Sequence, residues 1–302
     1  MNYRSFTAGD VNIVIDLWNE SMTQDRINES KFNRMVLYDQ NFDPKALIIC
    51  EDGKEPVGFI YSARQGDQAW IVAFGIKSSA MGKGVGKELL NLTEEKLKKD
   101  GVAKISVGPY PLNFICPGVD KNNYAKAVEF FTASGYQTTG EASSMHINLR
   151  GYQTPDKYIQ RKKSLEGEYI FKPFEPSDAL SLFDFVKDDF PWWMPDIRNS
   201  ILAGRAEKTM ILAKEKSSGR TVGFVMRMMD GTPERFGPFG TKPDTQGKGI
   251  GAILFHDMME NLIKDGIFYT YFLWTTGRNL DIYGTWGMTV YRTYAMMSKT
   301  LS

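Results

Sequence analysis

Apolar residues recur along the chain in two series that follow the same order. Each series opens with a stretch in which every third or fourth residue is apolar, which predicts an amphipathic helix. Short apolar runs bounded by turn residues follow and predict strands, the first of which begins a hairpin. The predicted elements are a helix at 10–21 and strands at 46–50, 70–76 and 104–107 in the first series, and a helix at 178–190 and strands at 210–213, 235–241 and 267–274 in the second.

The two series are related in sequence as well as in pattern. With an offset of 165 residues, the glycine loops and helices at 81–101 and 246–266 are identical at ten of 21 positions. Further on the offset falls to 152, because the first copy carries thirteen extra residues at 108–120. Such self-similarity indicates a duplicated domain. We expect a first domain at 1–150, a linker at 151–166 and a second domain at 167–302.

Composition narrows the classes of function. The chain of 302 residues has 37 Lys and Arg and 36 Asp and Glu, which gives a formal net charge of +1. A chain so close to neutrality has no field that would attract nucleic acid or an anionic membrane, and no apolar run is long enough for a membrane span. Cys50 and Cys116 are the only cysteines, and the N-terminus lacks a secretory signal. We therefore expect a cytoplasmic protein without disulfides or a metal.

The glycine loop of the second copy has the chemistry of a phosphate site. It reads Gln246-Gly-Lys-Gly-Ile-Gly251 and lies between a predicted strand and a predicted helix. Glycines let backbone N–H groups approach an anion, and the helix adds the positive end of its dipole. The chain lacks the Gly-x-x-x-x-Gly-Lys-Ser/Thr of P-loops, and its dinucleotide-like pattern lies in mid-domain without the acidic ribose ligand downstream. The pattern that fits is Gln-x-x-Gly-x-Gly.

This pattern resembles the acyl-CoA loop of the GNAT superfamily of N-acetyltransferases, and the resemblance covers nearly the whole chain as two tandem units. It implies an α/β (α+β) fold in which each domain has a mixed, mostly antiparallel, twisted sheet flanked by helices. It also implies acetyl-CoA as co-substrate and no metal. The residues implied to contact acetyl-CoA are Phe239, Gly240, Thr241, Gln246, Gly247, Lys248, Gly249, Ile250, Gly251 and Asn279.

Two residues are implied to act in catalysis. Tyr283 begins a Tyr-x-x-x-Gly-Met sequence that is close to the family's Tyr-x-x-x-Gly-Phe, and it would protonate the leaving thiolate. Glu234, at the start of the strand that leads to the loop, is a candidate to accept the proton of the amine. Asp230 and a water relay are the alternatives.

The first copy differs where the chemistry is most sensitive. Met81 stands in the place of Gln246 and Phe131 in the place of Tyr283, so this copy lacks the phenol hydroxyl. We therefore expect the second domain to be catalytic and the first to be structural or to bind CoA without catalysis, as in tandem enzymes similar to mycothiol synthase. The second possible CoA loop consists of Gly82, Lys83, Gly84, Val85 and Gly86.

The expected function is the transfer of an acetyl group to the primary amine of a small molecule by direct attack, without a covalent enzyme intermediate. The expected partners are acetyl-CoA and a small amine, not nucleic acid or a membrane. Two other functions fit the same residues: a non-catalytic CoA-binding or scaffold protein, and an acetyltransferase that acts on a protein lysine or N-terminus. The sequence favours no particular oligomeric state.

Overall fold

The chain folds into two compact units. The structure is a computed structural model that describes residues 1–301. The N-terminal unit is made of three segments and the C-terminal unit of two, so the chain passes between them more than once. The segments of the first are Met1–Ser143, Leu273–Thr276 and Tyr291 onward, and those of the second are Ser144–Phe272 and Gly277–Val290.

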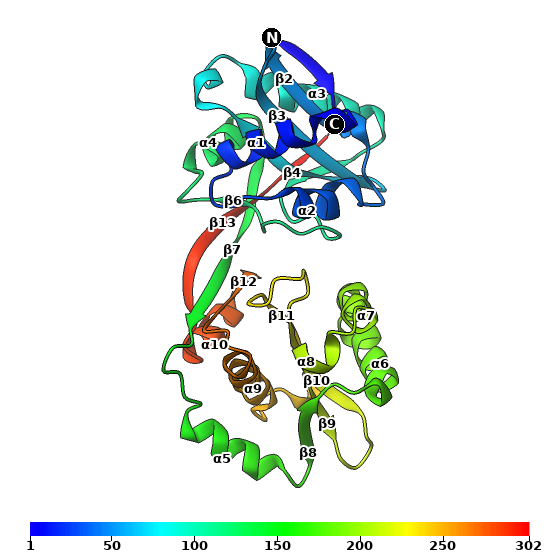
Figure 1. Ribbon diagram of the computed structural model, residues 1–302, viewed down its shortest axis with the longest axis vertical. Helices are drawn as coiled ribbons and strands as arrows, with labels where there is room; N and C mark the ends of the chain where they lie inside the picture. The colour runs from blue at the N-terminus through cyan, green and yellow to red at the C-terminus, as the bar shows by residue number, and fades with distance from the viewer. Residues whose placement is uncertain (302) are drawn as a thin grey trace. The chain divides into compact units, whose positions relative to one another are not determined.

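The N-terminal unit contains a mixed sheet and four α-helices among the described residues (Figure 1). Its elements are β1 (Asn2–Ser5), α1 (Val11–Ser21), α2 (Glu29–Phe32), β2 (Leu47–Asp52), β3 (Glu55–Gln65), β4 (Gln68–Ile76), α3 (Val85–Lys99), β5 (Lys104–Val107), β6 (Val119–Asp120), α4 (Ala125–Ala133), the first part of β7 (Gln137–Asn148) and most of β13 (Thr289–Thr300). The strand order is β1-β2-β3-β4-β5-β13-β7. From β1 to β13 neighbouring strands are antiparallel, except that β4 and β5 are parallel.

Side-chain alternation gives this sheet two apolar faces. Leu47 and Ile49 of β2 belong to a core cluster with Trp18 of α1. Cys50, on the opposite face, belongs to a second cluster with Leu89 of α3. Because a helix covers each face, both sets of positions must be apolar, and β2 reads as a continuous apolar run rather than an alternating one.

The C-terminal unit repeats this layering. Its elements are the end of β7, α5 (Asp156–Leu165), β8 (Tyr169–Pro173), α6 (Ala179–Asp189), α7 (Met194–Leu202), α8 (Ala206–Thr209), β9 (Met210–Glu215), β10 (Thr221–Arg227), β11 (Phe236–Thr241), α9 (Ile250–Lys264), most of β12 (Tyr269–Thr275) and α10 (Arg278–Thr285). Strands β8 to β11 form an antiparallel sheet in the order β11-β10-β9-β8, and β12 lies beside β7. Ile211 and Ala213 of β9 pack on the side of α9, and Leu212 packs on the side of α6.

Strand β13 completes the sheet of the N-terminal unit. It lies between β5 and β7, and its residues Met297–Thr300 pair with Lys104–Val107 of β5. It also pairs with β6, which ends the thirteen extra residues of the first copy. Gly118, in that segment, approaches β13 so closely that an added Cβ would lie 2.3 Å from the carbonyl oxygen of Ala295. The sequence-based boundaries assigned β13 to the second domain, whereas most of it packs in the N-terminal unit.

The stretch expected to be a linker, 151–166, is largely helical and packs on the C-terminal unit. Lys162 of α5 donates hydrogen bonds of 2.7 and 2.8 Å to the carboxylate of Asp257 on α9. Leu165 is buried in the same core cluster as several residues of α9. The segment therefore belongs to the C-terminal unit rather than bridging freely between domains.

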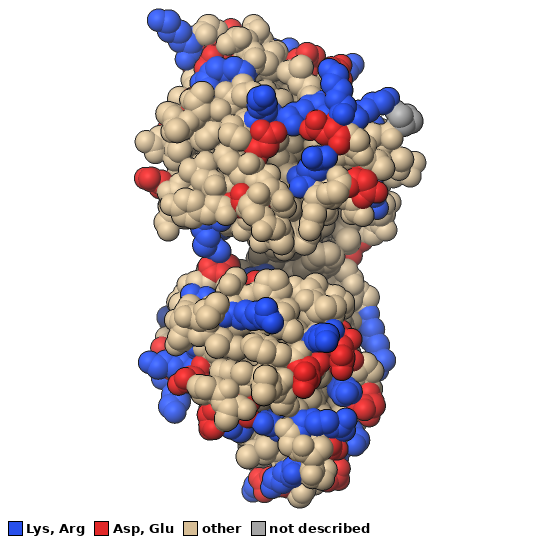
Figure 2. All heavy atoms as spheres, turned by 90° about the vertical axis from the view of Figure 1, so that its right-hand side faces the viewer, with Lys and Arg blue, Asp and Glu red and all other residues tan. Residues whose placement is uncertain are grey.

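The expected fold class, a mixed and mostly antiparallel sheet flanked by helices, is confirmed. Within residues 1–301 no helix is both long and apolar enough to cross a membrane. Lys and Arg side chains are interspersed with Asp and Glu on the face shown in Figure 2, without a large area of one sign. This mixture agrees with the net charge of +1.

Candidate active site

A large cavity lies in the N-terminal unit beside the first glycine loop. Its volume is ≈ 1310 Å³. It extends from the first glycine loop, including Gly82 and Gly84, along Ile71–Ile76 of β4 to Ser21 at the end of α1 and Asp25 after it. Arg292 of β13 also lines it. The cavity is thus lined by residues of the first copy, of the extra segment and of the last strand.

The cavity opens where two parallel strands separate. The pairing of β4 with β5 ends at Ile71 and Val107, and Gly108 N donates a last hydrogen bond of 2.9 Å to Ile71 O. Beyond this point Val72–Ile76 line the cavity on the side that β5 has left. A strand edge of this kind offers backbone donors and acceptors to an extended ligand.

The first glycine loop leaves room for an anion at the start of α3. Gly82 and Gly84 have φ of +75° and +83°, and an added Cβ on either would meet no atom within 4 Å. The first backbone bond of the helix runs from Glu88 N to Gly84 O, so the N–H groups of Val85–Lys87 have no partner within the helix. These amides and the helix dipole favour a phosphate group.

The second glycine loop, although similar in backbone, is covered. Gly249 has φ of +87°, but an added Cβ would lie 3.1 Å from Cγ of Arg161 on α5. Arg161 Nε donates a 2.7 Å hydrogen bond to Lys248 O. Lys248 Nζ donates a 2.8 Å hydrogen bond to the hydroxyl of Tyr169, so the lysine predicted to bind phosphate has a protein partner.

Aromatic rings occupy the region around the predicted catalytic tyrosine. The Tyr283 ring lies 4.7 Å from that of Phe272 and 5.5 Å from that of Trp286, between centroids. Burial raises the pKa of Tyr283 above its ordinary value. Phe190 covers the predicted backbone contact at Gly240, where an added Cβ would lie 2.7 Å from the ring. Gly75, the equivalent residue of the first copy, is similarly close to a side chain, with an added Cβ 2.6 Å from Ser21 Cβ. The aromatic packing around Tyr283, rather than the cover over Gly240, distinguishes the second copy.

The other predicted site residues are dispersed. Glu234 lines a shallow depression with Asn148 and Tyr269, so it lies in different surroundings from Tyr283. Asn279 of α10 and Gln246 of the loop are exposed. The loop positions Gly247, Lys248, Gly249, Ile250 and Gly251 do surround the start of α9, and Phe239, Gly240 and Thr241 do lie on β11 directly before the loop.

One substitution between the copies accounts for much of the difference in open space at the two sites. The repeat aligns Ser134 with Trp286, and Phe131 with Tyr283. Trp286 packs at 5.1 Å from Phe255 and 6.1 Å from Phe239, between ring centroids. Ser134 lines the cavity instead. A small residue in the first copy leaves space that a large ring fills in the second.

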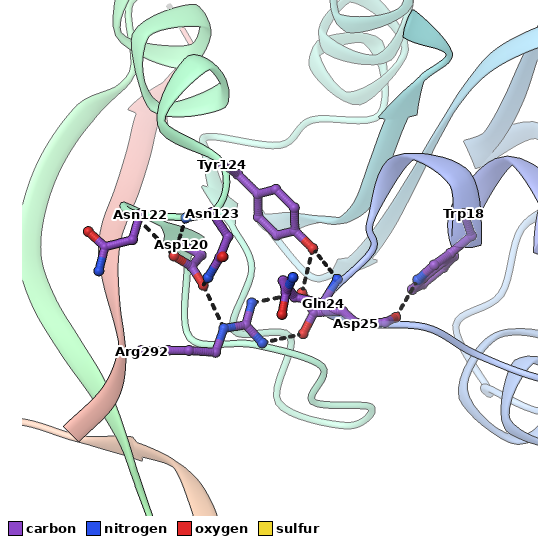
Figure 3. A network of polar contacts seen from close by, with 8 residues as sticks. All are labelled: Trp18, Gln24, Asp25, Asp120, Asn122, Asn123, Tyr124 and Arg292. Carbon is purple, nitrogen blue, oxygen red and sulfur yellow. Dashed lines mark hydrogen bonds and ion pairs between the residues drawn. The ribbon is translucent and has the colours of Figure 1, made fainter. Parts of the chain in front are cut away.

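A buried charged network, drawn in Figure 3, borders the cavity through Asp25, Tyr124 and Arg292. Arg292 donates hydrogen bonds of 2.7 and 2.8 Å to the two carboxylate oxygens of Asp25, and its Nε donates one of 2.6 Å to Asp120. The side chains of Arg292, Asp25 and Asp120 are 8%, 9% and 1% exposed. Tyr124, at the start of α4, donates a 3.2 Å hydrogen bond to Asp25 Oδ2 and accepts one from the backbone of Gln24.

Burial and pairing act in opposite directions on this network. Burial alone would lower the pKa of Arg292, but the carboxylates of Asp25 and Asp120 raise it above its ordinary value. Burial alone would raise the pKa of Asp120, but hydrogen bonds from Asn123 and Arg292 lower it. Burial and then the charge of Asp25 raise the pKa of the Cys116 thiol, which also lines the cavity, to about 12. The guanidinium and the Asp120 carboxylate are therefore charged at pH 7, and the thiol is neutral.

Sequence reasoning missed Asp25, Asp120, Tyr124 and Arg292. Asp25 and Arg292 are 267 residues apart, and no local motif connects them. Asp120 lies in the segment that was recognised only as an insertion. The alignment of Ser134 with Trp286 was the available signal that the first copy has the more open site.

The comparisons with known proteins agree with the fold. Residues 12–115, in the N-terminal unit, match the acetyltransferase (GNAT) family. No curated protein sequence matches the chain. Among the described residues no group of three His, Cys, Asp or Glu side chains could hold a metal ion.

Several solved structures share the architecture of the whole chain. A GCN5-related glucosamine N-acetyltransferase region of a fungal multidomain GH3 β-N-acetylglucosaminidase has a TM-score of 0.82 at 19% identity; the match covers 99% of this chain and 38% of that one. A GCN5-related N-acetyltransferase from Sphaerobacter thermophilus has a TM-score of 0.74 at 16% identity, covering 99% and 95%. A tandem GNAT protein from the clavulanic acid biosynthesis pathway has a TM-score of 0.68 at 12% identity, covering 99% and 98%.

Proposed function

We propose that this chain, whose residues 12–115 belong to the acetyltransferase (GNAT) family, transfers an acetyl group from acetyl-CoA to the primary amine of a small molecule, and that the N-terminal unit binds the acetyl-CoA. The sequence alone favoured the second copy, because that copy retains Gln246 and Tyr283. The observation that carries the present proposal is the ≈ 1310 Å³ cavity that joins the open first loop to the free edge of β4.

The residues of the first loop fit the diphosphate of acetyl-CoA. Its backbone amides converge at the start of α3, its glycines have no side chains that would obstruct a ligand, and Lys83 is exposed beside them. The edge of β4 at Val72–Ile76 suits the amides of the pantetheine arm, which would pair with it as an added strand. The second loop supports the same allocation, since Arg161 would have to move before a diphosphate could approach Gly249.

The reaction itself needs little covalent chemistry from the protein. When bound, acetyl-CoA supplies an activated thioester carbonyl. The ammonium group of the acceptor first loses one proton to solvent. The free amine then forms a C–N bond as the C–S bond breaks, and its second proton goes to the departing thiolate. Cys116 does not provide a nucleophile, because its pKa near 12 keeps the thiol protonated at neutral pH. Direct transfer to the amine is therefore favoured over an acyl-enzyme.

Amino sugars are the first acceptors to assay. The fungal relative with a TM-score of 0.82 is described as a glucosamine N-acetyltransferase region, although this chain spans only 38% of that protein. Release of free thiol from acetyl-CoA in the presence of glucosamine and other primary amines would identify the acceptor.

A matched pair of variants tests the location of the co-substrate. Gly84→Glu and Gly249→Glu place the same side chain at equivalent positions with φ of +83° and +87°, so both carry the same backbone strain. We expect Gly84→Glu to weaken acetyl-CoA binding by more than about tenfold in calorimetry, because a carboxylate would then face the diphosphate at the helix N-terminus. Gly249→Glu should bind like the wild type. The opposite result would return the site to the second copy.

A further inference from the structure

The charged network that borders the N-terminal cavity carries an unbalanced negative charge. Asp25 and Asp120 contribute two carboxylates, and Arg292 contributes the only cation within their network. Lys87 and Lys126 also line the cavity, but both are exposed, and solvent screens their charges. A buried site with an excess negative charge favours a cationic ligand.

The hydrogen bonds of the two carboxylates show where such a cation can bind. Each carboxylate oxygen of Asp120 accepts two hydrogen bonds, and the donors are Asn122, Asn123 and Arg292. Asp25 Oδ2 also accepts two, from Arg292 and Tyr124. Among the described residues only Arg292 donates to Asp25 Oδ1, and a carboxylate oxygen accepts two hydrogen bonds. One acceptor position at Asp25 Oδ1 is therefore available to a ligand in the cavity.

We propose that Asp25 binds the protonated amino group of the acceptor, and that Arg292 from the last strand holds its carboxylate in position. This inference rests on the proposed function and adds to it the residue that selects the acceptor. Asp25 lines the same cavity as the edge of β4, where the thioester would lie. Trp18 Nε1 donates a 2.9 Å hydrogen bond to Asp25 O, which fixes the backbone at this position as well.

A second polar atom on the same wall indicates more of the acceptor. The hydroxyl of Ser21 is buried and has no hydrogen-bond partner within the described chain. It lies beside β4, since an added Cβ on Gly75 would be 2.8 Å from Ser21 Oγ. An unpaired buried hydroxyl is costly, and Ser21 lines the cavity, so rotation of its side chain toward the cavity would let a ligand hydroxyl supply the missing partner. Amino sugars are cationic amines that carry such hydroxyl groups.

Glucosamine and glucose form a matched pair of probes, because glucose replaces the ammonium group with a hydroxyl. We expect the wild type loaded with CoA to bind glucosamine at least about tenfold more tightly than glucose in calorimetry, and Asp25→Asn to remove most of this difference. In steady-state assays with glucosamine, Asp25→Asn should raise KM at least about tenfold, while the Kd for acetyl-CoA stays within about twofold of the wild type.

The control is another buried aspartate of the same unit. Asp39 is 8% exposed and accepts hydrogen bonds from Tyr110 and Asn113, but it does not line the cavity. Asp39→Asn should leave KM for glucosamine unchanged. Asp25→Glu retains the charge and should recover part of the lost affinity, which a loss through misfolding would not.

The outcomes separate the two proposals. Loss of glucosamine selectivity in Asp25→Asn with acetyl-CoA binding intact supports the amine subsite. A wild type that binds glucosamine no better than glucose, or an Asp25→Asn variant with unchanged KM, overturns it. Neither result concerns the diphosphate site, which fails only if Gly84→Glu still binds acetyl-CoA. Arg292→Lys should raise KM with little change in kcat, because lysine keeps the charge but not the bidentate contact.

Discussion

Replacing Arg292 by methionine leaves the carboxylates of Asp25 and Asp120 buried without their cation. Their side chains are only 9% and 1% exposed, so water solvates these carboxylates much less than it would at the surface. Removal of one partner from a buried ion pair costs about 3–5 kcal/mol. Protonation of one carboxyl limits this cost, because protonating a group of ordinary pKa at pH 7 takes about 4 kcal/mol. We therefore expect the free energy of unfolding of the N-terminal unit to fall by about 3–5 kcal/mol at pH 7, and by less at pH 5.

Urea denaturation followed by tryptophan fluorescence measures this change, because Trp18 lies next to the network. Arg220→Met is the control. The Arg220 and Glu215 side chains are 61% and 29% exposed, and an exposed pair of this kind contributes under about 1 kcal/mol. A triple variant that also carries Asp25→Asn and Asp120→Asn should recover part of the loss, since no buried charge remains. If Arg292→Met lowers the free energy of unfolding no more than Arg220→Met does, Arg292 does not compensate buried negative charge in the folded protein.

Two further predictions concern the C-terminal unit. Tyr283→Phe should leave kcat within about twofold of the wild type in a thiol-release assay, because the proposed acetyl-CoA site lies in the N-terminal unit and the Tyr283 ring packs against Phe272. A loss of a hundredfold or more would restore the acid role expected from the sequence. His256 is buried, shares a hydrogen bond with the hydroxyl of Tyr152 through Nδ1, and has its pKa lowered by burial to about 4. Between about pH 6.5 and 4 the unfolded chain binds this proton and the folded chain does not, so stability should fall as the pH drops through this range. His256→Gln should flatten that dependence in urea titrations.

The fold followed from the sequence because its signals are local. The helix at 10–21 and the strand at 70–76 appear as Val11–Ser21 and Gln68–Ile76, since periodicity and turn residues determine each of them within a few positions. The last strand was misassigned for the opposite reason. Its partner in β5 is almost two hundred residues away, and apolar periodicity does not identify which of two similar sheets a strand joins.

The candidate site shows the same division between local and tertiary information. The glycine loops were recognisable because they are continuous in sequence, and both begin a helix as expected. The different accessibility of the two loops was not recognisable from the sequence, because Arg161 reaches Gly249 from a helix that lies in the expected linker. Because the first copy has Phe131 in place of Tyr283, the sequence favoured the second copy as the catalytic one. The space left by Ser134 is evident only when the surrounding rings are placed.

The position of β13 has a consequence for how the chain folds during synthesis. The N-terminal unit lacks an inner strand of its sheet, and Arg292 with it, until residues 144–290 have been made. At about 5–20 residues per second, that delay is roughly 7–30 s. During this time β5 presents an unpaired edge on the nascent chain, and such edges are prone to intermolecular association. The N-terminal unit leaves the ribosome first, yet its sheet can be completed only after the C-terminal unit has been synthesised.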